Sequence, residues 1–132
     1  MWKWTENKAI DLTGKIVANI DIDQDNDEMQ ITCTDGTKYL FHHVQDCCES
    51  VNIVDVQGDP KALVGYKLIM IEEGGDFLTE EYEEYIYDES CTTTEFVFHT
   101  SKDSLAVRWI GCSNGYYSEE VDISDLTPKK DK

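Results

Sequence analysis

Short runs in which apolar and polar residues alternate dominate the chain, and such runs predict β-strands. The clearest run covers residues 15–23, where Ile16, Ala18, Ile20 and Ile22 fall on one side of an extended chain. Because one face of such a strand normally packs on a core, we expect these four side chains to point inward.

Further strands are predicted where β-branched and aromatic residues gather between turn signals. The pair Asp35-Gly36 separates residues 29–34 from residues 37–44 and is the strongest hairpin signal in the chain. The remaining predicted strands are 51–56, 63–72, 92–99, 105–111 and 116–123.

Helix is expected only within residues 72–89 and around residues 61–63. About seven or eight short strands with turns between them predict a mainly β fold. We therefore expect a small antiparallel sandwich or a partly open barrel with at most one or two short helices.

The length and composition fit one folded domain. The chain has 132 residues, of which 40% are hydrophobic and 11% aromatic, so it can fill a core. We expect a single domain over residues 1–132, with its core between about 12 and 123 and a frayed tail at 126–132. There is no run of about 18 apolar residues and no secretory signal, so a cytoplasmic protein is expected.

The charge of the chain is strongly negative and unevenly placed. Acidic residues outnumber basic residues by 28 to 11, and the formal net charge is −17. Such a surface disfavours direct binding to nucleic acid or to an anionic membrane, because both attract basic surfaces. Nine of the acids lie in residues 72–89, a segment without Lys or Arg. This acidic segment therefore carries about half of the net charge.

The acidic segment 72–89 has two interpretations. Its aromatic residues distinguish it from a simple solvated tail and favour a surface that binds a basic host protein. A solvated loop or helix face is the alternative. On the first interpretation, the partner-binding residues are Glu72, Glu73, Asp76, Glu80, Glu81, Tyr82, Glu83, Glu84 and Tyr85.

A second acidic cluster covers residues 21–28 and has the alternating aspartates of a calcium-binding loop. A loop that starts at Asp21 has Asn26 instead of glycine at its sixth position. Its twelfth position is Thr32, which lacks the carboxylate that should bind calcium there. We therefore expect a polar turn after a strand.

Five cysteines, an odd number without an export signal, are expected to be reduced thiols. They are Cys33, Cys47, Cys48, Cys91 and Cys112. Neighbouring residues of an extended chain point to opposite faces, so joint ligation of one metal by Cys47 and Cys48 is not expected.

Residues 41–50 concentrate two histidines, two thiols and two carboxylates. One interpretation is a site for one divalent transition metal on His42, Asp46, Cys48 and Glu49, with a further ligand from elsewhere in the chain. Imidazole and thiolate are suitable donors for such a metal, and carboxylate balances its charge.

Two other interpretations of the same residues remain open. In a thiol-dependent enzyme, His42 would be the base and Asp46, Cys47 and Cys48 would complete the catalytic site. In a polar turn that leads into a strand, histidine and carboxylate only hold the chain, and there is neither a catalytic residue nor a cofactor.

Two signatures resemble a family of small uncharacterised proteins from bacteriophages and bacteria, catalogued as a domain of unknown function. The first is Phe41-His42-x-x-Gln45-Asp46-Cys47-Cys48-Glu49, and the second is Arg108-Trp109-x-Gly111-x-Ser113-Asn114-Gly115-Tyr116-Tyr117-Ser118-Glu119. The resemblance covers most of residues 12–123, and residues 74–88 have no counterpart in the family pattern. It implies a phage or mobile-element origin and supplies no activity.

Two functions from different classes follow. The first is a non-enzymatic, phage-type binding protein that inhibits a host nuclease or defence complex by occupying its basic nucleic-acid-binding groove. The second is a small metal- or thiol-dependent enzyme centred on His42, Asp46, Cys47, Cys48 and Glu49. We favour the first, because the acidic segment is the most unusual feature of the chain. The sequence identifies neither the partner nor the oligomeric state.

Overall fold

The computed structural model describes residues 8–45, 47–75, 77, 80–85, 90–115 and 117–128. This part of the chain forms eight β-strands and three short 3₁₀ helices, and none of these helices is long and apolar enough to cross a membrane. The strands are β1 (Val17–Asp23), β2 (Glu28–Cys33), β3 (Lys38–His42), β4 (Ser50–Gln57), β5 (Met70–Gly74), β6 (Ser90–His99), β7 (Ser104–Ser113) and β8 (Asp122–Asp125). The helices are η1 (Lys8–Leu12), η2 (Pro60–Leu63) and η3 (Glu80–Tyr85).

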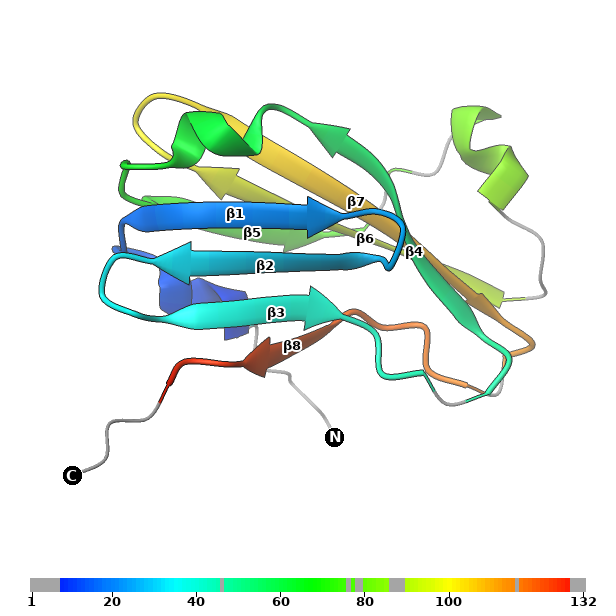
Figure 1. The fold of residues 1–132 in the computed structure, drawn as a ribbon. Helices are drawn as coiled ribbons and strands as arrows, with labels where there is room; N and C mark the ends of the chain where they lie inside the picture. Colours follow the sequence, from blue (N-terminus) through cyan, green and yellow to red (C-terminus); the bar gives the residue numbers. More distant parts are fainter. Residues whose placement is uncertain are drawn as a thin grey trace.

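The strands form two antiparallel sheets that pack face to face (Figure 1). One sheet has the strand order β1-β2-β3-β8 and the other has the order β4-β7-β6-β5. The predicted mainly β fold is confirmed as a sandwich of two four-stranded sheets, which do not close into a barrel. The predicted hairpin between β2 and β3 is also confirmed, with Gly36 at a φ of 95° in the turn.

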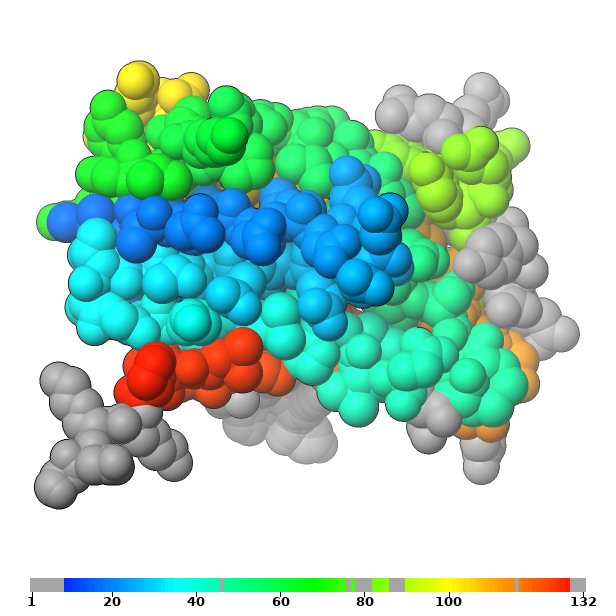
Figure 2. All heavy atoms as spheres, viewed as in Figure 1, coloured from blue at the N-terminus to red at the C-terminus, as the bar shows by residue number. Residues whose placement is uncertain are grey.

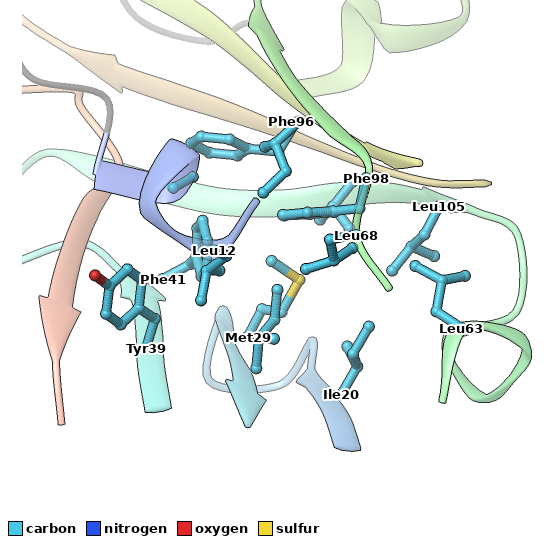
Figure 3. Packing of buried hydrophobic residues seen from close by; sticks show 14 of the residues in the cluster. Leu12, Ile20, Met29, Tyr39, Phe41, Leu63, Leu68, Phe96, Phe98 and Leu105 are labelled. Atoms are coloured by element: carbon cyan, nitrogen blue, oxygen red, sulfur yellow. The ribbon is translucent and has the colours of Figure 1, made fainter. Parts of the chain in front are cut away.

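The core lies between the two sheets. Phe41 on β3 meets Phe96 and Phe98 on β6 edge to face, with ring centroids 5.1 and 5.8 Å apart. Figure 3 shows these rings among aliphatic side chains, with Met29 of β2 beside them. Trp109 on β7 is fully buried, in agreement with the alternation of its strand. These contacts hold the sheets together and position the loops at their ends.

A β-bulge in β1 changes which side chains face the core. The pairing with β2 shifts between Val17 and Asn19, and Val17 is fully buried while Ile16 is 40% exposed. Beyond the bulge, Ile20 is buried as predicted. The bulge adds a residue to one strand, which reverses the inward face on one side of it.

The single buried strand predicted over residues 63–72 is wrong. Leu63 ends η2, and β5 begins only at Met70. Between them, residues 65–68 hydrogen-bond to residues 14–17, which end at the first residue of β1. Gly65 has a φ of 91°, a left-handed conformation that interrupts an extended chain.

The last strand is shorter than the predicted strand over 116–123, since β8 covers only Asp122–Asp125. The chain stays attached to β3 beyond it. The Leu126 amide donates to the Lys38 carbonyl at 2.7 Å, and the Lys38 amide donates to Thr127 Oγ1 at 3.0 Å. Leu126 and Thr127 were expected in the frayed tail and instead extend the edge of the sheet.

Candidate functional site

At one end of the sandwich, the connection that carries the first signature lies beside the chain that follows the second signature. In Figure 1 the connection from β3 to β4 and the connection from β7 to β8 run beside each other. His43 Nδ1 lies 2.8 Å from the Glu120 carbonyl oxygen, and the Val44 amide donates to Asp122 Oδ2 at 2.9 Å. These contacts join segments that are more than 70 residues apart in the sequence.

His43 and Glu49 form a buried pair at this junction. His43 Nε2 lies 2.7 Å from Glu49 Oε2, and the two side chains are 4% and 0% exposed. Glu49 Oε1 accepts a hydrogen bond from the Cys47 amide at 2.9 Å. Both ring nitrogens of His43 therefore face oxygen atoms, and the tautomer decides which nitrogen donates. His43 and Glu49 thus form a buried hydrogen-bonded pair that ties the β3–β4 connection to the chain before β8.

A polar pocket of about 180 Å³ lies beside this pair, between the β1–β2 turn and the start of β4. His42, His43 and Glu49 all line the pocket. His42 Nε2 lies 2.7 Å from Ser124 Oγ on β8, and Asp46, its predicted partner, lies outside the described residues. The histidine that meets Glu49 is His43.

The predicted metal and catalytic sets fall partly outside what the structure describes, because both include Asp46. Within the described residues, no group of three or more His, Cys, Asp or Glu side chains is arranged to hold a metal ion. His42 and Glu49, two of the four proposed ligands, share the pocket but have different hydrogen-bond partners.

Four of the five cysteines are paired, so the expectation of five reduced thiols is wrong. Cys47 and Cys48 form one disulfide, because the chain bends there instead of continuing extended. Cys91 and Cys112 lie directly opposite each other on β6 and β7 and form the second disulfide, with their Cα atoms 4.1 Å apart. Cys33 keeps its thiol, and burial raises the pKa of that thiol.

Glu119, from the second signature, is another buried carboxylate. Its Oε2 accepts from Ser113 Oγ at 2.5 Å and its Oε1 accepts from Thr92 Oγ1 at 2.6 Å. Burial acts to raise the pKa of Glu119, but the hydrogen bonds outweigh it and the pKa lies below its ordinary value. A Cβ on Gly111 would lie 2.5 Å from the Glu119 carbonyl oxygen, so glycine allows this close approach.

The lowered pKa of Glu119 has a consequence for stability in acid. A carboxylate with a depressed folded-state pKa stabilises the protein above its unfolded pKa of about 4.3, and this stabilisation is lost as pH falls through the folded pKa. We expect Glu119→Gln to lower the free energy of unfolding at pH 7 by about 1–3 kcal/mol, because charge-assisted hydrogen bonds are lost. The difference from the wild type should shrink below about pH 4.

Urea unfolding at a series of pH values measures this difference. The exposed neighbour Glu120 provides the matched control Glu120→Gln, for which we expect a small and constant difference. A Glu119→Gln difference that stays the same from neutral to acid pH would contradict the prediction.

The acidic segment is anchored on the outer face of the β4-β7-β6-β5 sheet. Phe77 and Tyr82 are buried together with Ile110 in a second, smaller apolar cluster. The Tyr82 hydroxyl donates to Asp55 Oδ2 and accepts from Arg108 Nη1, each at 2.9 Å. Tyr82, one of the predicted partner-binding residues, therefore fixes η3 to β4 and β7.

Arg108 contacts the acidic segment on the side that faces the sheet. Its Nε donates to Glu95 Oε2 at 2.7 Å, and its guanidinium carbon lies 5.0 Å from the centroid of the Phe77 ring. The hydrogen bond with Glu95 raises the pKa of Arg108 above its ordinary range. Arg108 therefore stays charged, and it carries ionic, hydrogen-bond and cation–π contacts at one position.

The remaining residues of the predicted partner-binding set have different environments. Glu72, Glu73, Glu83 and Glu84 are exposed, and Tyr85 is half-buried. Glu72 Oε1 lies 3.0 Å from His99 Nε2. Asp76 and the side chains of Glu80 and Glu81 lie outside the described residues.

Sequence reasoning missed the structural role of Asp27. The predicted polar turn after a strand is confirmed at residues 24–27, between β1 and β2, and Asp27 has a φ of 55° in it. Its carboxylate accepts from the Ile53 amide and from Asn52 Nδ2, each at 2.9 Å, and so connects the first sheet to β4. The alternating pattern of aspartates does not show that Asp27, rather than one of its neighbours, makes these contacts.

Arg108 was missed as well, although the sequence contains a signal for it. It occupies an outward position on a strand whose alternate residues, Val107 and Trp109, are buried. A single basic residue on that face is the natural partner for nearby acids.

Comparison with known proteins identifies a family and no activity. A family model described as a domain of unknown function, DUF7448, matches residues 10–123. No curated protein and no solved structure matches the chain.

Proposed function

The chain belongs to the family described as a domain of unknown function, DUF7448, and for this member we propose a non-enzymatic binding function in which the acidic segment 72–89 docks on a basic partner protein. The observation that carries the proposal is the anchoring of this segment. Tyr82 and Phe77 attach the segment to the outer face of the sheet, while Glu83 and Glu84 are exposed on η3.

Anchoring makes the acidic charge useful for recognition. A charge on a chain that has already lost its conformational freedom costs less ordering entropy on binding than the same charge on a loose tail. The contacts of Tyr82 with Asp55 and Arg108 supply this ordering before the partner arrives. Complementary charge then increases the rate of encounter and selects basic partners.

The partner surface that fits best is a groove that normally holds DNA or RNA. Such grooves carry Lys and Arg side chains that neutralise phosphates, and closely spaced carboxylates present similar negative charge. The resemblance to phage and bacterial proteins makes a nuclease or defence complex in the host cytoplasm the natural target. In that setting the protein is an inhibitor that excludes nucleic acid from its partner.

The geometry favours this function over an enzyme built on residues 42–49. His43 and Glu49 are almost completely buried and bind each other and the main chain. Cys47 and Cys48 are joined to each other, whereas a nucleophilic cysteine must be a thiolate.

The double substitution E83Q/E84Q tests the proposal because it removes two exposed charges without touching the anchor. We expect the variant to bind its partner about tenfold more weakly, since the loss of each well-placed interfacial charge costs up to about 1 kcal/mol. The measurement is capture from a bacterial lysate at about 0.15 M salt, followed by identification of the captured protein. The expected partner binds nucleic acid and is released by added DNA or RNA.

The pair D21N/D25N is the matched control, because it removes the same charge from exposed positions in the β1–β2 region. We expect this control to retain the partner. If E83Q/E84Q retains it equally well, the acidic segment is not the docking surface. An equal loss in both variants would attribute capture to net charge alone.

A further inference from the structure

The Cys47–Cys48 disulfide lies in an exposed turn. It connects consecutive residues between β3 and β4, and both residues are exposed. Figure 2 shows this connection at the molecular surface, at the same end of the molecule as η3. A small molecule dissolved in water can therefore reach the disulfide.

Stability does not explain this bond. A disulfide stabilises a protein mainly by restricting the unfolded chain, and the effect grows with the length of the closed loop. The Cys91–Cys112 bond closes a loop with a sequence separation of 21, whereas the Cys47–Cys48 bond has a separation of 1. The Cys91–Cys112 bond is therefore a structural cross-link between β6 and β7. The Cys47–Cys48 bond closes almost no loop and so restricts the unfolded chain very little.

The turn that holds this disulfide is linked directly to the buried Glu49–His43 pair. The Cys47 amide donates to Glu49 Oε1 at 2.9 Å, while Glu49 Oε2 contacts His43. Gln45 Nε2 donates to the carbonyl oxygens of Cys47 at 3.2 Å and of Glu49 at 2.5 Å. A change in the path of the chain at Cys47 therefore acts on Glu49 and His43.

We propose that Cys47 and Cys48 form a redox site that exchanges with low-molecular-weight thiols of the glutathione class, and that the Glu49–His43 pair responds to its state. In the reduction, a thiolate attacks one sulfur, the Cys47–Cys48 bond breaks and a mixed disulfide forms. A second thiolate attacks the mixed disulfide and releases an oxidised thiol dimer. The two cysteines together gain two electrons and two protons, which two thiols supply.

This site is independent of the acidic docking surface, because its chemistry uses no residue of segment 72–89. The bond at Cys91–Cys112 provides an internal reference for accessibility. Cys112 is 1% exposed, so a thiolate reaches it with difficulty in the folded protein. Cys33 is buried as well and reports unfolding.

The test begins with air-oxidised protein at neutral pH. Glutathione is added, samples are quenched with acid at intervals, and new thiols are alkylated and assigned by peptide mass. We expect Cys47 and Cys48 to become labelled at least about tenfold faster than Cys91 and Cys112, because thiol attack requires access to sulfur. Glutathione disulfide should restore the bond. Labelling of all four at one rate, or thiols at Cys47 and Cys48 in the oxidised protein, would overturn the proposal.

The response of the Glu49–His43 pair is measured by NMR of the histidine rings during the same reduction. We expect the His43 ring signals to shift and those of His99, whose partners are Ser104 and Glu72, to stay in place. The double variant C47S/C48S should show no shift of His43 under either condition. A His43 signal that does not change in the wild type would contradict the coupling, even if the cysteines exchange.

Discussion

Replacing Glu49 with alanine is expected to lower the free energy of unfolding by about 2–5 kcal/mol, because a buried carboxyl group is removed and its hydrogen-bond partners are left in place without it. The side chain of His43 is 4% exposed and loses its contact with Glu49 Oε2. The Cys47 amide loses its acceptor at the same time. Chemical denaturation monitored by tryptophan fluorescence at fixed redox conditions measures the change.

An apolar double variant separates the polar contact from the packing of the two side chains. We expect H43F/E49L to be much closer to the wild type than Glu49→Ala alone, because neither side chain is left buried without its polar partner. Glu49→Gln keeps the size of the side chain and should fall between the two. If Glu49→Ala lies within about 1 kcal/mol of the wild type, the pair does not stabilise this end of the sandwich.

The second large effect is expected at Phe41. Phe41→Ala should lower the free energy of unfolding by about 3–5 kcal/mol, since a buried aromatic side chain is lost and a cavity remains. The ring is fully buried and meets both Phe96 and Phe98 of the opposite sheet. Because the site residues lie on loops at the end of the sandwich, this substitution should loosen their arrangement too.

Leu40 provides the matched control, since it is the neighbour of Phe41 on β3 and points to the other, half-buried face. Leu40→Ala should cost clearly less than Phe41→Ala in the same denaturation experiment. Equal losses would mean that β3 is stabilised along its whole length and that the aromatic contacts between sheets contribute little.

Local sequence patterns predicted most of the sandwich. The hairpin at Gly36 and the strand around Trp109 depend on turn chemistry and alternation, which act within a few residues. The bulge at Val17 and the irregular chain at Gly65 were not predictable in this way. Both depend on hydrogen bonds between segments far apart in the sequence, such as that from the Gly65 amide to the Val17 carbonyl.

The candidate site was only partly visible in the sequence for the same reason. The residue types between 41 and 50 marked this segment as a candidate, but alternation alone did not show that His43 would meet Glu49. That pairing needs the bend at Cys47 and the carbonyl of Glu120, which directly follows the second signature. In the acidic segment, the sequence identified the charge, while the anchor at Tyr82 appeared only in three dimensions.

The most direct test of the proposed function is competition between this protein and nucleic acid for the captured partner. With labelled DNA or RNA bound to the purified partner, increasing amounts of wild-type protein should displace it. E83Q/E84Q should require about tenfold more protein for the same displacement, and D21N/D25N should behave as the wild type. A complex in which the partner holds both this protein and nucleic acid at once would contradict the account.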